Sequence, residues 1–126
     1  MMLLLDTGAL IAYERGSRTV QAFLERAHRT GDTVRTSTAA VAQAWRDGSR
    51  QARVALLLRG TDESELTRDR ARRIGRLLLL AGTADVVDGS IVDLGHDGDE
   101  ILTSDTDDMQ RLATVAGKTL IVTHVS

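Results

Sequence analysis

Apolar and polar positions follow one another along the chain in blocks that predict strands and helices in alternation. The apolar run over residues 2–5 is typical of a buried strand, and the β-branched segment 33–36 predicts a second strand. Two more strands are expected over residues 100–103 and 120–123, and residues 60–67 could hold a short edge strand. Because strands joined through helices form right-handed βαβ units, the pattern predicts an α/β protein with a parallel sheet.

Helices are predicted where apolar residues recur every three or four positions. Such a stripe, which contains Phe23 and Ala27, predicts a helix that Ser17 caps and Gly31 ends. A similar stripe, ended by Gly82, predicts a helix over residues 68–81. The remaining helices are expected over residues 39–47, 51–58, 84–94 and 107–116.

Length and composition favour one globular domain over residues 1–126, with 42% apolar residues available for a core. The absence of cysteine excludes disulfide bonds and thiolate metal sites. The first apolar run is too short for a signal peptide, and the longest run cannot span a bilayer, so we expect a cytoplasmic protein without a membrane partner. No glycine-rich phosphate loop occurs, so no nucleotide cofactor is expected.

Charge is distributed unevenly, although the net charge of −2 predicts no partner by itself. Residues 35–76 contain ten arginines, whereas residues 77–110 contain nine acids and no Lys or Arg. These segments could be solvated helix faces, or they could form a polyanion-binding surface beside an acidic pocket.

Two carboxylates stand directly after predicted strands, which end at the same edge of a parallel sheet. Asp6 follows the first strand, and Asp105 follows the strand over residues 100–103. Between them, Asp85 and Asp88 are three positions apart and are expected to share a helix face, and Asp108 adds charge near Asp105. Each of these acids alone could simply cap a helix or lie in its first turn.

Together, however, these carboxylates would repel one another, raise their own pKa values and destabilise the fold. A hard divalent cation such as Mg²⁺ or Mn²⁺, which prefers oxygen ligands, would remove that repulsion. Such an ion can activate water and stabilise the charge that develops on a phosphate during in-line displacement. The pattern therefore favours phosphodiester hydrolysis without a Ser, Cys or His nucleophile.

The motifs "LLLDTGALIAY", "DVVDGSIV" and "ILTSDTDDM" occur in this order over nearly the whole chain. In these motifs the sequence resembles the PIN domain ribonucleases and, within them, the VapC-type toxins of bacterial toxin–antitoxin pairs. The resemblance implies a three-layer sandwich with a central parallel sheet of four to five strands. It also implies an RNA substrate, a small antitoxin protein as partner, and a homodimer.

The resemblance also implies the members of the site. Asp6, Asp88 and Asp105 would hold the metal ion, with Thr7 at the hydroxyl position beside the first acid. Family members usually carry a Glu where this chain has Gln43, which would orient a water. The missing charge should lower metal affinity and disfavour a second ion. Supporting roles would fall to nearby acids, namely Asp85 and Asp108, with Asp47 as a partial substitute for the missing Glu.

The sequence thus predicts a metal-dependent endoribonuclease that is the toxin of a type II toxin–antitoxin pair. The alternative is a catalytically weakened or inactive PIN-fold protein that binds RNA or regulates, which Gln43 favours. Two other acidic α/β classes do not match. A phosphatase with an Asp nucleophile needs a second Asp where Gly8 stands, and a receiver domain needs a Lys at the end of the last strand, whereas Lys118 precedes it.

Overall fold

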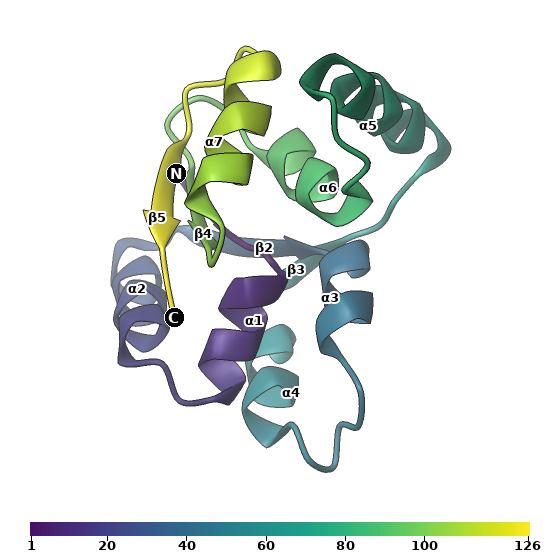
Figure 1. Ribbon diagram of the computed structural model, residues 1–126. Helices are drawn as coiled ribbons and strands as arrows, with labels where there is room; N and C mark the ends of the chain where they lie inside the picture. Colours follow the sequence, from purple (N-terminus) through teal and green to yellow (C-terminus); the bar gives the residue numbers. More distant parts are fainter.

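Five strands form one parallel sheet in the computed structural model, which describes residues 1–126 (Figure 1). The strand order is β3-β2-β1-β4-β5, so β1 lies in the centre and β3 and β5 form the edges. The predicted parallel sheet and the short edge strand are confirmed. The strands are β1 (Met2–Leu5), β2 (Thr33–Ser37), β3 (Asp62–Ser64), β4 (Glu100–Thr103) and β5 (Ile121–His124).

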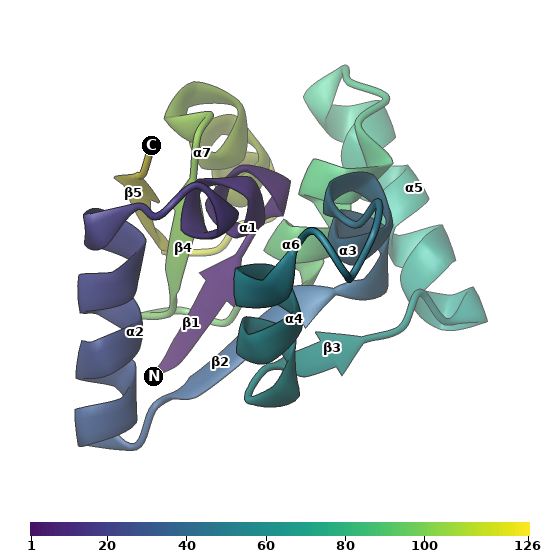
Figure 2. The same cartoon turned by 90° about the horizontal axis from the view of Figure 1, so that it is seen from below.

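Seven helices cover the two faces of this sheet. Helices α5, α6 and α7 lie on one face and α1 to α4 on the other, which gives the three layers expected (Figure 1). Figure 2 shows the sheet from below, with α1 and α4 in front of its strands and α2 on the left. The helices are α1 (Thr7–Glu14), α2 (Arg18–Thr30), α3 (Thr38–Ala44), α4 (Ala52–Arg59), α5 (Arg68–Ala81), α6 (Val86–Leu94) and α7 (Thr106–Val115).

The core lies on both sides of the central strands. Leu4 and Leu5 of β1 and Ile101 of β4 are fully buried, and helices from both layers pack on them through residues such as Leu10 and Ile91. Because both faces of β1 are covered, its sequence is continuously apolar rather than alternating. The apolar run of β1 ends at Leu5, and the next residue along the chain is the carboxylate Asp6.

No helix combines the length and the apolar composition that crossing a membrane requires.

Helix α3 ends three residues earlier than the sequence pattern predicts. The chain turns to an extended conformation at Trp45. The side chain of Gln51 then donates to the carbonyl of Ala44 at 2.9 Å and accepts from the backbone N–H groups of Arg46 and Asp47 at 2.7 and 3.0 Å. Because one side chain from the next segment takes over these backbone groups, the helix stops before the predicted glycine.

Candidate functional site

Three of the predicted acids stand at the first residue before a helix, where each accepts a backbone hydrogen bond. Asp6 caps α1 through the N–H of Ala9 at 2.8 Å, and Asp105 caps α7 through the N–H of Asp108 at 3.2 Å. Each cap uses one of the two carboxylate oxygens. These acids therefore have a structural role as helix caps, and that role does not by itself prevent them from binding a metal ion.

Asp85 also caps a helix, which corrects the expectation that it shares a helix face with Asp88. Helix α6 begins at Val86 rather than at residue 84, and Asp85 accepts the N–H of Asp88 at 3.0 Å. Asp88 lies in the first turn and caps nothing. The difference arises because an Asp at the cap position stabilises the helix start better than inside the first turn.

Pairing of the central strands brings Asp6 and the β4–α7 loop together. Leu5 pairs with Leu102, and the N–H of Asp6 donates to the Leu102 carbonyl at 3.3 Å. The Thr103 hydroxyl accepts the N–H of Asp105 at 2.9 Å and also hydrogen-bonds the Asp6 carboxylate. One threonine thus connects the first and third predicted metal ligands.

Gly8 permits this close approach. A methyl group on Gly8 would collide with the side chain of Ser104, in the loop between β4 and α7. Only a glycine lets the first turn of α1 lie against that loop, so the short "DTG" motif has a packing reason as well as a chemical one.

The pKa values of several of these carboxylates are shifted by burial and by one another's charge. Burial raises the pKa of Asp88 to about 7, with further contributions from the charges of Asp85, Asp6 and Asp105. The pKa of Asp6 is raised as well, chiefly by burial, because its side chain is almost wholly enclosed. Asp105 raises the pKa of Asp108 through a hydrogen bond and its charge. Asp88 thus lies where the charges of three other predicted acids disfavour its ionised form.

These acids do not form a ready-made metal cage. No group of three or more His, Asp or Glu side chains in the chain is close enough to hold a metal ion as the side chains stand. The structure brings the predicted ligands to one edge of the sheet without assembling them.

Gln43 contacts Thr7, the residue that follows the first acid. The Thr7 hydroxyl donates a hydrogen bond to Oε1 of Gln43 at 2.9 Å, so helices α1 and α3 meet at this point. Asp47, by contrast, lies beyond the end of α3, where its carboxylate accepts from the N–H and hydroxyl of Ser49. Asp47 is thus held in its own turn and is not positioned to replace a Glu at residue 43.

A layer of buried hydroxyls beneath the acids escaped the sequence analysis. Ser37 caps α3 and shares a 2.7 Å hydrogen bond with Ser90 of α6. Thr36 donates at 2.7 Å to the carbonyl of Leu5, immediately before Asp6. A Ser that precedes a predicted helix is a recognisable cap signal, so Ser37 could have been found, but nothing in the sequence pairs it with Ser90.

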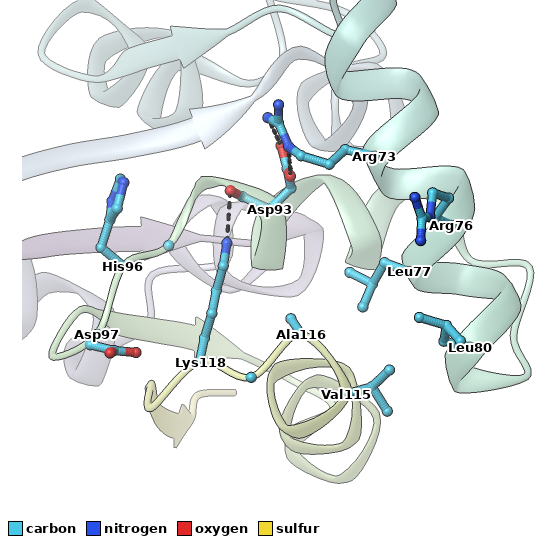
Figure 3. A pocket seen from close by; sticks show the side chains of 12 residues that line it. Arg73, Arg76, Leu77, Leu80, Asp93, His96, Asp97, Val115, Ala116 and Lys118 are labelled. Carbon is cyan, nitrogen blue, oxygen red and sulfur yellow. Dashed lines mark hydrogen bonds and ion pairs between the residues drawn. The ribbon is translucent and has the colours of Figure 1, made fainter.

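One cavity lies away from these acids. It has a volume of about 960 Å³, lies among α5, α6 and α7, and contains none of the predicted ligands (Figure 3). Within it Arg73 donates to both carboxylate oxygens of Asp93, and Nζ of Lys118 donates to the Asp93 carbonyl at 3.0 Å. Since these charged groups bind one another, we assign them to holding the helices together.

The sheet order, the two helical layers and the acids at the ends of β1 and β4 define a protein with the PIN-like fold. No protein-family model and no curated protein matches this chain. Its structure is similar to a chain in the crystal structure of VapBC2 from Rickettsia felis bound to a DNA fragment from its promoter, with a TM-score of 0.67 and 14% identity. The match covers 98% of each chain. The expected fold is therefore confirmed.

Proposed function

We propose that the protein is a Mg²⁺- or Mn²⁺-dependent endoribonuclease, the toxin of a type II toxin–antitoxin pair. The observation that carries this proposal is that burial and the neighbouring carboxylates of Asp85, Asp6 and Asp105 raise the pKa of Asp88 in a PIN-like fold. Asp88 is the most informative of the three, because it caps no helix and yet lies where burial and three other carboxylates raise its pKa to about 7.

The donor set fits a hard divalent cation by type. Asp6 and Asp105 each keep an oxygen that the helix cap does not use, and the carboxylate of Asp88 completes an all-oxygen set. A bound ion would supply an activated water and would stabilise negative charge on the scissile phosphate. Because the ligands are not preassembled, binding includes a rearrangement of these side chains.

The neighbouring residues have supporting roles in this proposal. Thr7 holds the carbonyl end of Gln43, which leaves the amide N–H₂ group to orient a water. Asp85 and Asp108 add negative charge at the same edge. With Gln43 in place of a carboxylate, the site holds one charge fewer, so we expect weaker metal binding and a single ion.

The proposed partners are RNA, a small antitoxin and a second copy of the chain. With only one Trp, one Tyr and one Phe, the protein would hold RNA through phosphate contacts with arginine rather than through stacking. The matched structure is VapBC2, a complex of toxin and antitoxin, and this supports an antitoxin as partner of the present chain.

Cleavage of RNA by purified protein in Mn²⁺ tests the proposal. Asp88→Asn should reduce cleavage at least ~100-fold, as expected for a lost group in metal-assisted hydrolysis. Asp69→Asn is the matched control, because Asp69 also lies in the first turn of a helix but belongs to α5. A folded Asp88→Asn protein that cleaves RNA at the wild-type rate contradicts the assignment.

Metal binding gives a second readout that does not require turnover. An ion that binds only the folded state adds RT ln(1 + [L]/Kd), roughly 2.7 kcal/mol at a hundredfold excess over Kd. Mn²⁺ should therefore raise the melting temperature of the wild type but not of the Asp6→Asn, Asp88→Asn double variant. Equal shifts in both proteins would place the ion elsewhere.

The second candidate function is an inactive PIN-like protein that binds RNA or regulates, and Gln43 is the observation that favours it. It predicts RNA binding that survives in Mn²⁺ without any cleavage product. The same two assays therefore separate the candidates.

A further inference from the structure

The cavity among α5, α6 and α7 lies at the other end of the sheet from two of the predicted metal ligands. Asp97 and Lys118, which line it, precede β4 and β5, whereas Asp6 and Asp105 follow β1 and β4. Since the strands are parallel, the two groups lie at opposite edges. Its volume of about 960 Å³ is at the upper end of the range of small-molecule sites. Nothing in the proposed hydrolysis uses this cavity.

One part of the cavity lining is apolar and only partly covered. It consists of Leu77 and Leu80 of α5 together with Val115 and Ala116 of α7 (Figure 3). In the folded chain, 69% of Leu80 and 37% of Val115 is exposed. Exposed apolar side chains that lie singly are ordinary, but those that gather at one cavity mark a site for an apolar group.

Cationic side chains form another part of the lining, and they keep unused donors. Arg73 donates to Asp93 through Nε and Nη2, which leaves Nη1 free. Lys118 uses two of its three N–H groups, which donate to the carbonyls of Val92 and Asp93 at 2.9 and 3.0 Å. Arg76 lines the same cavity and makes no hydrogen bond or ion pair within the chain, unlike Arg73 (Figure 3).

Positive charge is in excess around this cavity. The carboxylate of Asp93 is bound by both Arg70 and Arg73, and the carboxylate of Asp97 accepts a backbone N–H. Burial lowers the pKa of Lys118, and the charges of Arg73 and Arg70 lower it further, against the opposite effect of the two carboxylates. The cations therefore repel one another, and a bound anion would relieve that repulsion.

We propose that the cavity binds a small organic phosphate with an aliphatic part. Arg76 binds the phosphate directly, because its guanidinium has no other partner and matches the geometry of an oxyanion. The unused N–H groups of Arg73 and Lys118 provide further donors. The aliphatic part covers Leu80 and Val115, which the fold leaves exposed.

The lining favours this ligand over three simpler ones. Inorganic phosphate would match the cations and leave the apolar side chains uncovered. A neutral apolar molecule would leave the excess positive charge unmatched. A nucleotide would need a surface on which to stack its base, and no Trp, Tyr or Phe lines the cavity. A phosphate ester with an aliphatic part matches both kinds of lining at once.

Calorimetric titration of the full chain tests the site, with hexyl phosphate as the probe. Hexyl phosphate should bind at least about tenfold more tightly than inorganic phosphate or hexanol, because each of these has only one part of the recognised chemistry. Adenosine monophosphate should bind more weakly than hexyl phosphate. The proposal is overturned if hexyl phosphate shows no saturable binding, if inorganic phosphate or hexanol binds equally well, or if the nucleotide binds more tightly.

Two pairs of variants at exposed helix positions locate the binding. Arg76→Ala should weaken binding of hexyl phosphate at least about tenfold, whereas Arg72→Ala, one turn earlier on α5 and outside the cavity, should not. Val115→Glu should weaken binding because the new carboxylate repels the phosphate, whereas Thr114→Glu adds the same charge outside the lining. Lys118 stays unchanged because it also holds the end of α6. Unchanged affinity in Arg76→Ala or in Val115→Glu overturns the proposal.

The result is distinguishable from that of the nuclease assays. Asp88→Asn removes a predicted metal ligand that does not line the cavity, and it should bind hexyl phosphate as tightly as the wild type does. An altered affinity in Asp88→Asn would place the phosphate at the acidic site and overturn the proposal. A protein that cleaves RNA and binds no hexyl phosphate would overturn this site and leave the nuclease intact, whereas binding without cleavage would support this site alone.

Discussion

The hydroxyl of Thr7 donates a 2.9 Å hydrogen bond to the side-chain oxygen of Gln43, across 36 residues of sequence. Thr7 directly follows the first acid, so the bond connects residue 43 to the segment that carries Asp6. A glutamate at residue 43 could accept the same bond, because both side chains present an oxygen at that position. The two residues differ by one negative charge, which makes the position a direct probe of the site.

Gln43→Glu should therefore have two opposite effects. In metal-free protein the added carboxylate repels Asp6 and Asp88, and we expect the free energy of unfolding to fall by roughly 1 kcal/mol. In Mn²⁺ the same carboxylate adds a ligand, and we expect about tenfold tighter binding, or ~1.4 kcal/mol. Thermal melting and a metal titration measure the two effects. Gln21→Glu on α2 adds the same charge elsewhere and should change neither the free energy of unfolding nor the metal affinity. If the two variants have the same stability and the same metal affinity, residue 43 does not belong to the site.

The raised pKa of Asp88 predicts the pH dependence of the metal-free protein. The folded pKa of about 7 is above the unfolded value of 3.8, so the folded state binds more protons between these values. Stability should consequently rise as pH falls from about 8 toward 5, by on the order of 1 kcal/mol, since partial exposure and screening reduce the effect of the full shift.

Denaturant unfolding in the presence of a chelator measures this slope. Asp88→Asn should flatten it, because Asn does not titrate. A wild type whose stability increases from pH 5 to 8 would contradict the electrostatic account of the site.

Asp93 should show the opposite behaviour. Burial acts to raise its pKa, but hydrogen bonds and charge from Arg73 and Arg70 outweigh burial and hold the pKa below 3.8. Its stabilisation is thus fully present above pH 4 and is lost as pH falls through the folded pKa. Asp93→Asn should cost about 2–3 kcal/mol at pH 7, because Arg70 is left nearly enclosed without its partner. Unfolding curves of both proteins at several pH values measure this effect. The difference in free energy of unfolding between wild type and Asp93→Asn should become smaller below pH 4. A difference that becomes larger there would show that the charge of Asp93 is not what stabilises the fold.

Gly8→Ala should destabilise the protein although alanine is the better helix former. The new methyl group meets the side chain of Ser104, and we expect a loss of about 1–3 kcal/mol. The double variant Gly8→Ala, Ser104→Gly should recover much of this loss, which a double-mutant cycle measures. A loss that is unchanged by Ser104→Gly would mean that the backbone of α1, rather than this contact, requires glycine.

The positions of the strands could be predicted from the sequence because local composition decides them. The positions of some helices could not. Helix α1 was missed because Ala9, Leu10 and Ala12 are all buried between the sheet and other helices, which removes the polar face that marks a surface helix. The end of α3 depends on Gln51, a side chain seven residues beyond Ala44. Local patterns cannot show such a contact.

The positions of the acids were predictable in part. Asp6 and Asp105 follow neighbouring parallel strands, so their shared edge follows from topology alone. The bonds of Thr7 to Gln43 and of Ser37 to Ser90 join helices that are distant in sequence, and a single sequence does not reveal which side chains will meet. The roles of all these residues in metal binding stay predictions.

The helix caps at residues 6, 85 and 105 have a consequence for how such a protein can change over time. A lineage that lost hydrolysis would still favour Asp or another capping residue at these three positions to begin α1, α6 and α7, since losing a cap costs about 1 kcal/mol. An acid at one of these cap positions is therefore weak evidence that a protein is an active nuclease. Asp88 caps no helix, and burial and neighbouring carboxylates raise its pKa, so selection for folding alone would not retain it. The residue at position 88, rather than the one at position 6, should therefore distinguish an active nuclease from a relative that has lost activity.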